Sequence, residues 1–109
     1  MEKIPYDKRS GKIWFNSKLV DWGKANVHLL NHGLHYASCV FEGERVYDGE
    51  IFKLEEHTDR LYHSAKRMDL TIPYTKEEIN KACNQIIKIQ NVQNLSLIHI
   101  SEPTRQAEI

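Results

Sequence analysis

The chain has 109 residues, of which 28% are charged and 40% hydrophobic, a composition typical of one small globular domain. Its 15 Lys and Arg residues balance 15 Asp and Glu residues, which excludes a strong field for nucleic acid or an anionic membrane. No apolar run approaches the roughly 20 residues that span a bilayer, and the polar start does not resemble a signal peptide. Cys39 and Cys83 form no C-x-x-C pattern, which favours free thiols in a reducing, cytoplasmic setting.

The first half of the chain is predicted to form two antiparallel β-hairpins. Residues 1–11 are polar and are expected to form an N-terminal arm. Apolar segments on both sides of Asn16-Ser17-Lys18 predict the first hairpin. In the second, Asp48-Gly49 joins a strand from Phe41 to Tyr47 to its partner, Glu50 to Lys53. Asp-Gly between such segments is the usual sequence of a two-residue turn with positive φ.

The second half of the chain changes to a helical period. Apolar residues recur at spacings of seven, four and three between Leu54 and Met68, which predicts a helix over this range. Thr75 and Glu78 have the spacing of a capping box, which predicts a second helix that frays near Asn91. Antiparallel hairpins followed by two helices indicate an α+β fold.

The segment from Asn31 to Gly43 concentrates polar and aromatic side chains between two glycines. Its first part fits neither a strand period nor a helix period, so a loop is predicted that becomes extended around Val40 and Phe41. Such residues on a loop beside a strand suggest a binding site held by a scaffold. Four side chains here could in principle bind zinc: His28, His32, His35 and Cys39. Their spacing matches no zinc finger or ribbon, so we expect no metal site, and histidines that hydrogen-bond to the backbone.

Three groups of residues occur in an order and spacing that match a known family. They are Ile13-Trp14-Phe15-Asn16 with Val20 and Trp22; Val27-His28, His32, Leu34-His35-Tyr36 and Val40-Phe41-Glu42-Gly43; and Glu56-His57, Arg60-Leu61 and Ser64-Ala65. With these groups the chain resembles the branched-chain amino-acid aminotransferases, which are fold-type-IV pyridoxal-phosphate enzymes. The resemblance covers residues 12–94 and implies part of the small N-terminal domain of such an enzyme.

The resemblance also implies an activity, a cofactor and partners. The family transfers the amino group of leucine, isoleucine or valine to 2-oxoglutarate, with pyridoxal 5'-phosphate (PLP) as cofactor. A cytoplasmic homodimer or higher homo-oligomer is expected, with small-molecule substrates and no nucleic acid or membrane partner. D-amino-acid aminotransferase and aminodeoxychorismate lyase share the scaffold and stay open as alternatives. A standalone module that binds a phosphorylated small molecule is the alternative from a different class.

Four residues have site roles that the resemblance implies. Arg60 is expected to bind the cofactor phosphate, and a permanently charged, planar guanidinium suits that task. Phe41 and Gly43 are expected to line the substrate pocket, and Tyr36 to reach the neighbouring subunit's site. The alternative for Arg60 is a solvated side chain paired with Glu56. For Phe41 and Tyr36 the alternative is ordinary core packing.

The resemblance places the lysine that forms the Schiff base in a second domain, so no catalytic residue is assigned here and the chain alone is expected to be inactive. Two positions depart from the family pattern. Ala37 stands where glycine is frequent, and Glu44 stands where an aliphatic residue is frequent. Both departures leave the preferred substrate open.

The segment Leu95 to Ile109 differs in character from the helix before it. Leu95 to Arg105 resembles, without a mismatch, the in-frame translation of a transposon-end sequencing adapter. Residues 95–109 are therefore predicted to be a non-native tail, and residues 12–94 a truncated domain. The alternative is an ordinary C-terminal strand of an intact small protein. Sequencing the gene decides between them, because genomic codons for residues 95–109 would contradict the prediction.

Overall fold

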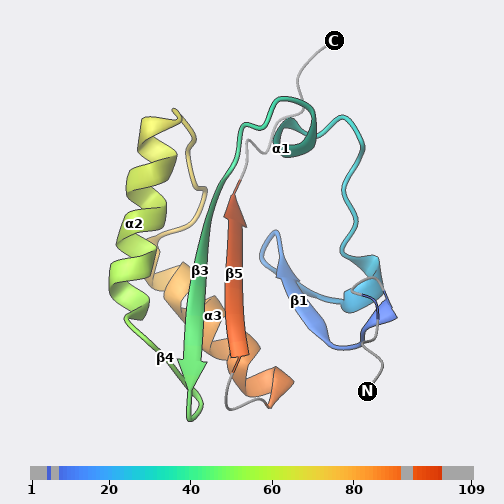
Figure 1. Cartoon of the computed structure of the whole chain (residues 1–109), viewed down its shortest axis with the longest axis vertical. Helices are drawn as coiled ribbons and strands as arrows, with labels where there is room; N and C mark the ends of the chain where they lie inside the picture. Colours follow the sequence, from blue (N-terminus) through green and yellow to red (C-terminus); the bar gives the residue numbers. More distant parts are fainter. Residues whose placement is uncertain (1–4, 6–7, 92–94, 102–109) are drawn as a thin grey trace.

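The computed structural model describes residue 5, residues 8–91 and residues 95–101. Hairpins come first and two long helices follow, so the predicted α+β fold is confirmed (Figure 1). The elements in chain order are β1 (Lys12–Phe15), β2 (Lys18–Asp21), the 3-10 turn η2 (Trp22–Lys24), α1 (His32–His35), β3 (Val40–Tyr47), β4 (Glu50–Ile51), α2 (Leu54–Arg67), α3 (Lys76–Gln90) and β5 (Leu95–Ser101).

Strands β1 and β2 form the first predicted hairpin. Phe15 pairs with Lys18, so Asn16 and Ser17 alone make the turn. Their φ angles of 50° and 68° are those of a turn in which both central residues are left-handed. The hairpin is attached to α3, where the Gln90 side-chain oxygen accepts a hydrogen bond from the backbone N–H of Lys12 at 3.0 Å.

The second sheet has the strand order β4-β3-β5. Strands β3 and β4 pair antiparallel with Tyr47 opposite Glu50, which leaves Asp48 and Gly49 as the turn. Their φ angles are 49° and 78°, so the predicted two-residue turn is confirmed. A sheet of three strands with helices on one face provides a rigid support for side chains on β3.

Strand β3 alternates strictly between buried and exposed residues. Val40 and Val46 on its buried side face the helix layer, and the core cluster joins Val40 to Leu61 and Ala65 of α2. The opposite side of β3 carries Phe41, which is 68% exposed. One strand therefore presents two chemically distinct faces, one toward the helices and one open.

Helices α2 and α3 begin and end close to the predicted residues. The Thr75 hydroxyl accepts a hydrogen bond from the Glu78 N–H at 3.1 Å, and the Glu78 carboxylate accepts one from the Thr75 N–H at 3.0 Å. This is the reciprocal capping box that the sequence predicts. The two helices are joined by the buried Thr58 hydroxyl, which donates to the Asn80 side chain at 2.5 Å. None of the described helices has the length and apolar character that a membrane crossing requires.

Helix α1 corrects the prediction that residues from Asn31 onward form a loop. The Asn31 side chain accepts a hydrogen bond from the Leu34 N–H at 2.8 Å, and its carbonyl accepts one from His35 at 2.9 Å. Asn31 thus caps a single helical turn. The prediction was wrong because four residues are too few to show a helical period.

Strand β5 is formed by Leu95–Ser101, the start of the predicted tail, and it runs antiparallel to β3. Phe41 lies opposite Ile100, and Val40 lies opposite Ser101. A segment rich in β-branched and aliphatic residues can satisfy the free edge of a strand whatever its origin. The non-native origin of residues 95–109 therefore stays a prediction, and residues 102–109 lie outside the described part.

Candidate functional site

A buried carboxylate joins β3 to α2. Glu42 on β3 is 6% exposed, and it accepts hydrogen bonds from Arg60 Nε at 2.9 and 3.1 Å and from Arg60 Nη2 at 2.9 Å. His57 Nδ1 lies 2.7 Å from the same carboxylate. His57 and Arg60 are three residues apart on α2, so both side chains leave the same face of the helix. We call Glu42, His57 and Arg60 the carboxylate cluster.

The charges in the carboxylate cluster stabilise one another. The hydrogen bonds from Arg60 lower the pKa of Glu42 below its ordinary value, with a smaller contribution from His57, although burial opposes the shift. The Glu42 carboxylate in turn raises the pKa of Arg60. A bidentate pair of arginine and carboxylate is both directional and strong for its kind. The cluster is therefore an ion pair with a fixed geometry at neutral pH.

Arg60 combines this anchor with an exposed end. Its side chain is 65% exposed, although its Nε and Nη2 atoms are bound to Glu42. Glu42, and not the Glu56 proposed as the alternative, is its ion-pair partner among the described residues. A guanidinium has five N–H groups, so the end turned away from Glu42 can still bind an anion.

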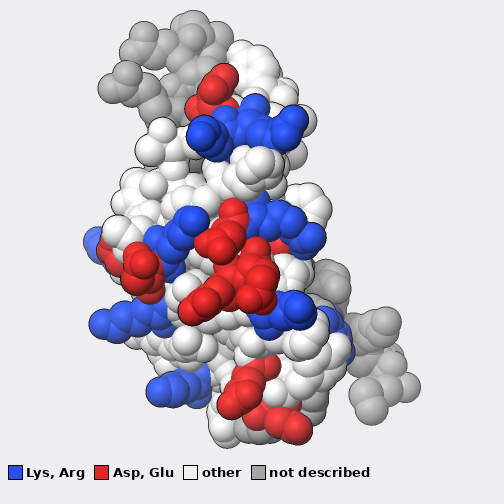
Figure 2. Space-filling model, turned by 90° about the vertical axis from the view of Figure 1, so that its left-hand side faces the viewer, with Lys and Arg blue, Asp and Glu red and all other residues white. Residues whose placement is uncertain are grey.

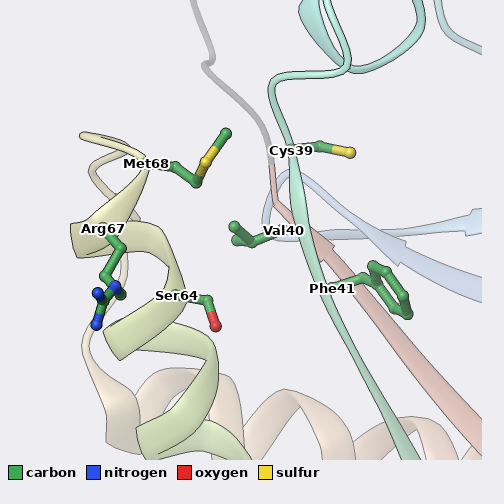
Figure 3. Close-up of a pocket in the computed structure, with 6 residues that line it drawn as sticks. All are labelled: Cys39, Val40, Phe41, Ser64, Arg67 and Met68. Carbon is green, nitrogen blue, oxygen red and sulfur yellow. The ribbon is translucent and has the colours of Figure 1, made fainter.

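Phe41 and Arg60 lie on different sides of β3. The Val40 side chain points toward α2, whereas Cys39 and Phe41 point away from that helix (Figure 3). Because Phe41 and Glu42 are neighbours on a strand, their side chains project to opposite faces. The structure thus places Arg60 next to β3 but does not bring its guanidinium onto the face that carries Phe41.

Gly43 and Tyr36 are both accessible. A Cβ atom built on Gly43 would meet no atom within 4 Å, so the backbone there can be approached closely. Gly43 shares the open face of β3 with Phe41. Tyr36 follows α1, is 55% exposed, and contacts the ring of His35 edge to face at 4.5 Å. Phe41 and Tyr36 are therefore not core residues within the described chain.

A hollow of about 370 Å³ lies where α2 ends and β3 begins. Its lining residues are Cys39, Val40, Phe41, Ser64, Arg67 and Met68 (Figure 3). Arg60 is not among them, so the hollow is separate from the carboxylate cluster. On the face of the molecule that carries α2, acidic and basic side chains are interspersed (Figure 2).

The side chains that the structure describes near α1 show no arrangement typical of a metal centre. Across the described residues, no group of three or more His, Cys, Asp or Glu side chains could hold an ion. His28 Nδ1 instead accepts a hydrogen bond from the Leu30 N–H at 3.0 Å. This is the backbone contact in a tight loop that the sequence suggests for such histidines.

Sequence reasoning assigned no role to Glu42 and His57, although both stand in the motifs. Glu42 lies 18 residues before Arg60, so no local spacing connects them. The one available signal is the alternation of β3, which puts Glu42 and Glu44 on the same side as Val46. Glu44 is 2% exposed, so the side chain expected to depart from the family pattern is fully buried.

Changing Glu42 to glutamine should alter the acid sensitivity of the fold. A carboxyl whose pKa is lowered by folding stabilises the fold above its ordinary pKa of 4.5, and this contribution is lost as the pH falls below that value. At pH 7 the variant should be less stable by about 1 kcal/mol, a modest cost because Arg60 is largely exposed. Chemical unfolding of the variant and the unchanged chain at pH 7 and pH 3 measures the difference in unfolding free energy at each pH. An equal difference at the two pH values would contradict the ion pair of Glu42 with Arg60.

Comparison with known proteins gives concordant matches. Residues 39–105 match the family described as amino-transferase class IV. A probable branched-chain-amino-acid aminotransferase of Rickettsia felis is 48% identical over 94 residues, which are 86% of this chain and 32% of that protein. The chain thus spans about a third of the length of the curated relatives it matches.

Solved structures agree. The branched-chain aminotransferase of Thermoproteus uzoniensis with norvaline superposes with a TM-score of 0.84 and 33% identity, covering 91% of this chain and 35% of that one. The branched-chain amino acid aminotransferase of Thermobaculum terrenum, in its PLP-bound holo form, has a TM-score of 0.72 and 27% identity, covering 84% and 32%. The family match extends over more than half of the residues, so this chain belongs to the class IV aminotransferases.

Proposed function

We propose that this chain is the N-terminal part of a branched-chain amino-acid transaminase that uses pyridoxal 5'-phosphate. The observation that carries the proposal is the anchored Arg60, whose guanidinium is held by Glu42 on one edge and is exposed on the other. Such a group fits a phosphate, because a permanently charged fork matches the spacing of phosphate oxygens. The Thermobaculum terrenum relative is known in its PLP form, which supports the same assignment.

In the proposed site the residues of this chain bind and orient. Arg60 binds the cofactor phosphate on one side of β3. On the opposite side, Phe41 with Gly43 offers an apolar ring and an open backbone to the substrate side chain. Tyr36 extends toward the second subunit of a cytoplasmic homodimer. When bound, pyridoxal phosphate supplies the electron sink for transfer of the amino group from leucine, isoleucine or valine to 2-oxoglutarate. The lysine that would bind the cofactor covalently is proposed to lie outside this chain.

The phosphate role of Arg60 can be tested with two ligands that differ only in phosphate. Pyridoxamine 5'-phosphate and pyridoxamine share one ring, and neither carries the aldehyde that would react with surface lysines. Titrated into the ¹⁵N-labelled chain, the phosphorylated ligand should shift the Nε–H signal of Arg60, and pyridoxamine should not. The reason is that a guanidinium binds phosphate through charge-assisted hydrogen bonds.

Arg67 supplies the matched control, because it is an exposed arginine on the same helix. Arg60→Gln removes the reporting Nε–H, so the variants are compared by their affinity for pyridoxamine 5'-phosphate, followed through backbone amide signals. Arg60→Gln should abolish this binding, and Arg67→Gln should leave it in place. Equal responses to the two ligands, or an equal loss in both variants, would show that the binding is non-specific and would overturn the phosphate role.

A further inference from the structure

Given the phosphate role proposed for Arg60, we infer that Glu42 and His57 are positioning residues that hold its guanidinium in a binding orientation. Glu42 is 6% exposed, on a central strand, so its carboxylate is a fixed point in the fold. It engages the Nε edge of Arg60, which fixes the plane of the guanidinium. The opposite edge then faces outward with a defined direction.

The geometry of the donors allows Arg60 to bind Glu42 through one edge of its guanidinium and a phosphate through the other. Nε and one N–H of Nη2 are used by Glu42. The remaining three of the five N–H groups belong to the end of the fork, where two can meet two oxygens of one phosphate. An arginine without an anchor samples many rotamers, and ordering it on binding reduces affinity. Glu42 orders it beforehand.

His57 completes the arrangement from one turn earlier on α2. Its Nδ1 lies 2.7 Å from Glu42 Oε1, the oxygen that also accepts from Arg60 Nη2. The His57 side chain is 20% exposed and so is itself restrained by packing. This contact limits rotation of the carboxylate, and through it the direction of the guanidinium.

Charge and positioning make opposite predictions for Glu42, and this makes the inference testable. Glu42→Gln removes a negative charge beside Arg60, so electrostatics alone predicts tighter binding of an anion. Positioning predicts weaker binding, because glutamine offers one acceptor oxygen. It cannot place a separate oxygen against each of the two Arg60 nitrogens, Nε and Nη2. Glu56→Gln is the matched control. Glu56 is an exposed carboxylate on α2, the helix that carries Arg60, and its replacement changes the net charge by the same amount.

The experiment measures the affinity of the ¹⁵N-labelled chain for inorganic phosphate and for pyridoxamine 5'-phosphate, together with the Arg60 Nε–H signal. Glu42→Gln should lower the affinity for both ligands by about two- to tenfold, because the Arg60 side chain must then be ordered on binding. The same variant should broaden or shift the Arg60 signal before any ligand is added. Glu56→Gln should bind as tightly as the unchanged chain or more tightly.

His57→Gln provides a second variant if Glu42→Gln does not fold. It leaves the pair of Glu42 and Arg60 intact and should weaken binding by a smaller factor. Unchanged or tighter binding in a folded Glu42→Gln or His57→Gln variant would overturn the positioning role while leaving the phosphate role of Arg60 standing. If the unchanged chain binds neither ligand, the phosphate role itself fails and the positioning role fails with it.

Discussion

At pH 8 the Cys83 thiol should react with iodoacetamide about a thousandfold more slowly in the folded chain than in the chain unfolded by urea. Cys83 is 4% exposed on α3, and burial raises the pKa of its thiol from 9.0 to about 12, with an added contribution from the charge of Glu44. Only the thiolate reacts, and three pKa units correspond to a thousandfold smaller thiolate fraction.

The measurement is cleanest in a Cys39→Ser background, because Cys39 is a second free thiol and is only half-buried. The rate of labelling by mass spectrometry then belongs to Cys83 alone. Transient unfolding limits the protection, so a thousandfold effect also requires a fold stable by about 4 kcal/mol or more. A rate within tenfold of that of the unfolded chain would contradict the burial of Cys83 on α3.

Replacing Leu61 with alanine should cost about 2–5 kcal/mol of unfolding free energy. Leu61 is 3% exposed and packs with Val40 and Ala65, with Leu70 and Ile72 at the edge of the cluster. A small domain is stable by only about 5–15 kcal/mol in total. The midpoint of thermal unfolding should therefore fall by about 10 °C or more.

Phe41→Ala is the control for the Leu61 substitution because it removes a larger side chain from β3, the strand against which Leu61 of α2 packs. Phe41 is 68% exposed and lies on the open face of β3. Its loss should change the unfolding free energy by about 0.5 kcal/mol. If the two variants are destabilised equally, Phe41 is packed in the folded chain, and the assignment of the two faces of β3 is wrong.

The parts of the fold that sequence predicts well are those with local causes. Asn16-Ser17 and Asp48-Gly49 tolerate positive φ, and the structure has all four residues in that region. The capping box of Thr75 and Glu78 fixes the start of α3 through two hydrogen bonds within four residues. In these cases the residues that determine the structure are neighbours in the sequence, so a short segment is enough to predict it.

The candidate site was predicted less completely, because its contacts are not local. The side chains of β3 alternate between Val40, Glu42, Glu44 and Val46 on one side and Phe41, Gly43, Arg45 and Tyr47 on the other. Neither set is wholly apolar, so hydrophobicity alone does not show which side is buried. Arg60 could be identified from its motif, but its partner Glu42 could be identified only once α2 had been placed on β3.

One departure from the family pattern has a physical explanation in the backbone. Ala37 has a φ of 58°, in the left-handed region where a side chain with a Cβ is disfavoured. Glycine adopts this conformation without strain, which is a physical reason to expect glycine at this position. Ala37 is therefore tolerated at a cost of about 1 kcal/mol.

The strict alternation of β3 restricts how its gene can vary. Inserting or deleting one codon between Val40 and Tyr47 would rotate every following side chain to the other surface of the sheet. An insertion directly after Val40 would turn the glutamate that anchors the arginine outward and place the aromatic ring against the helices. Lineages carrying this strand can accept substitutions at its positions, but changes in its length are tolerated only in pairs of residues or at its two ends.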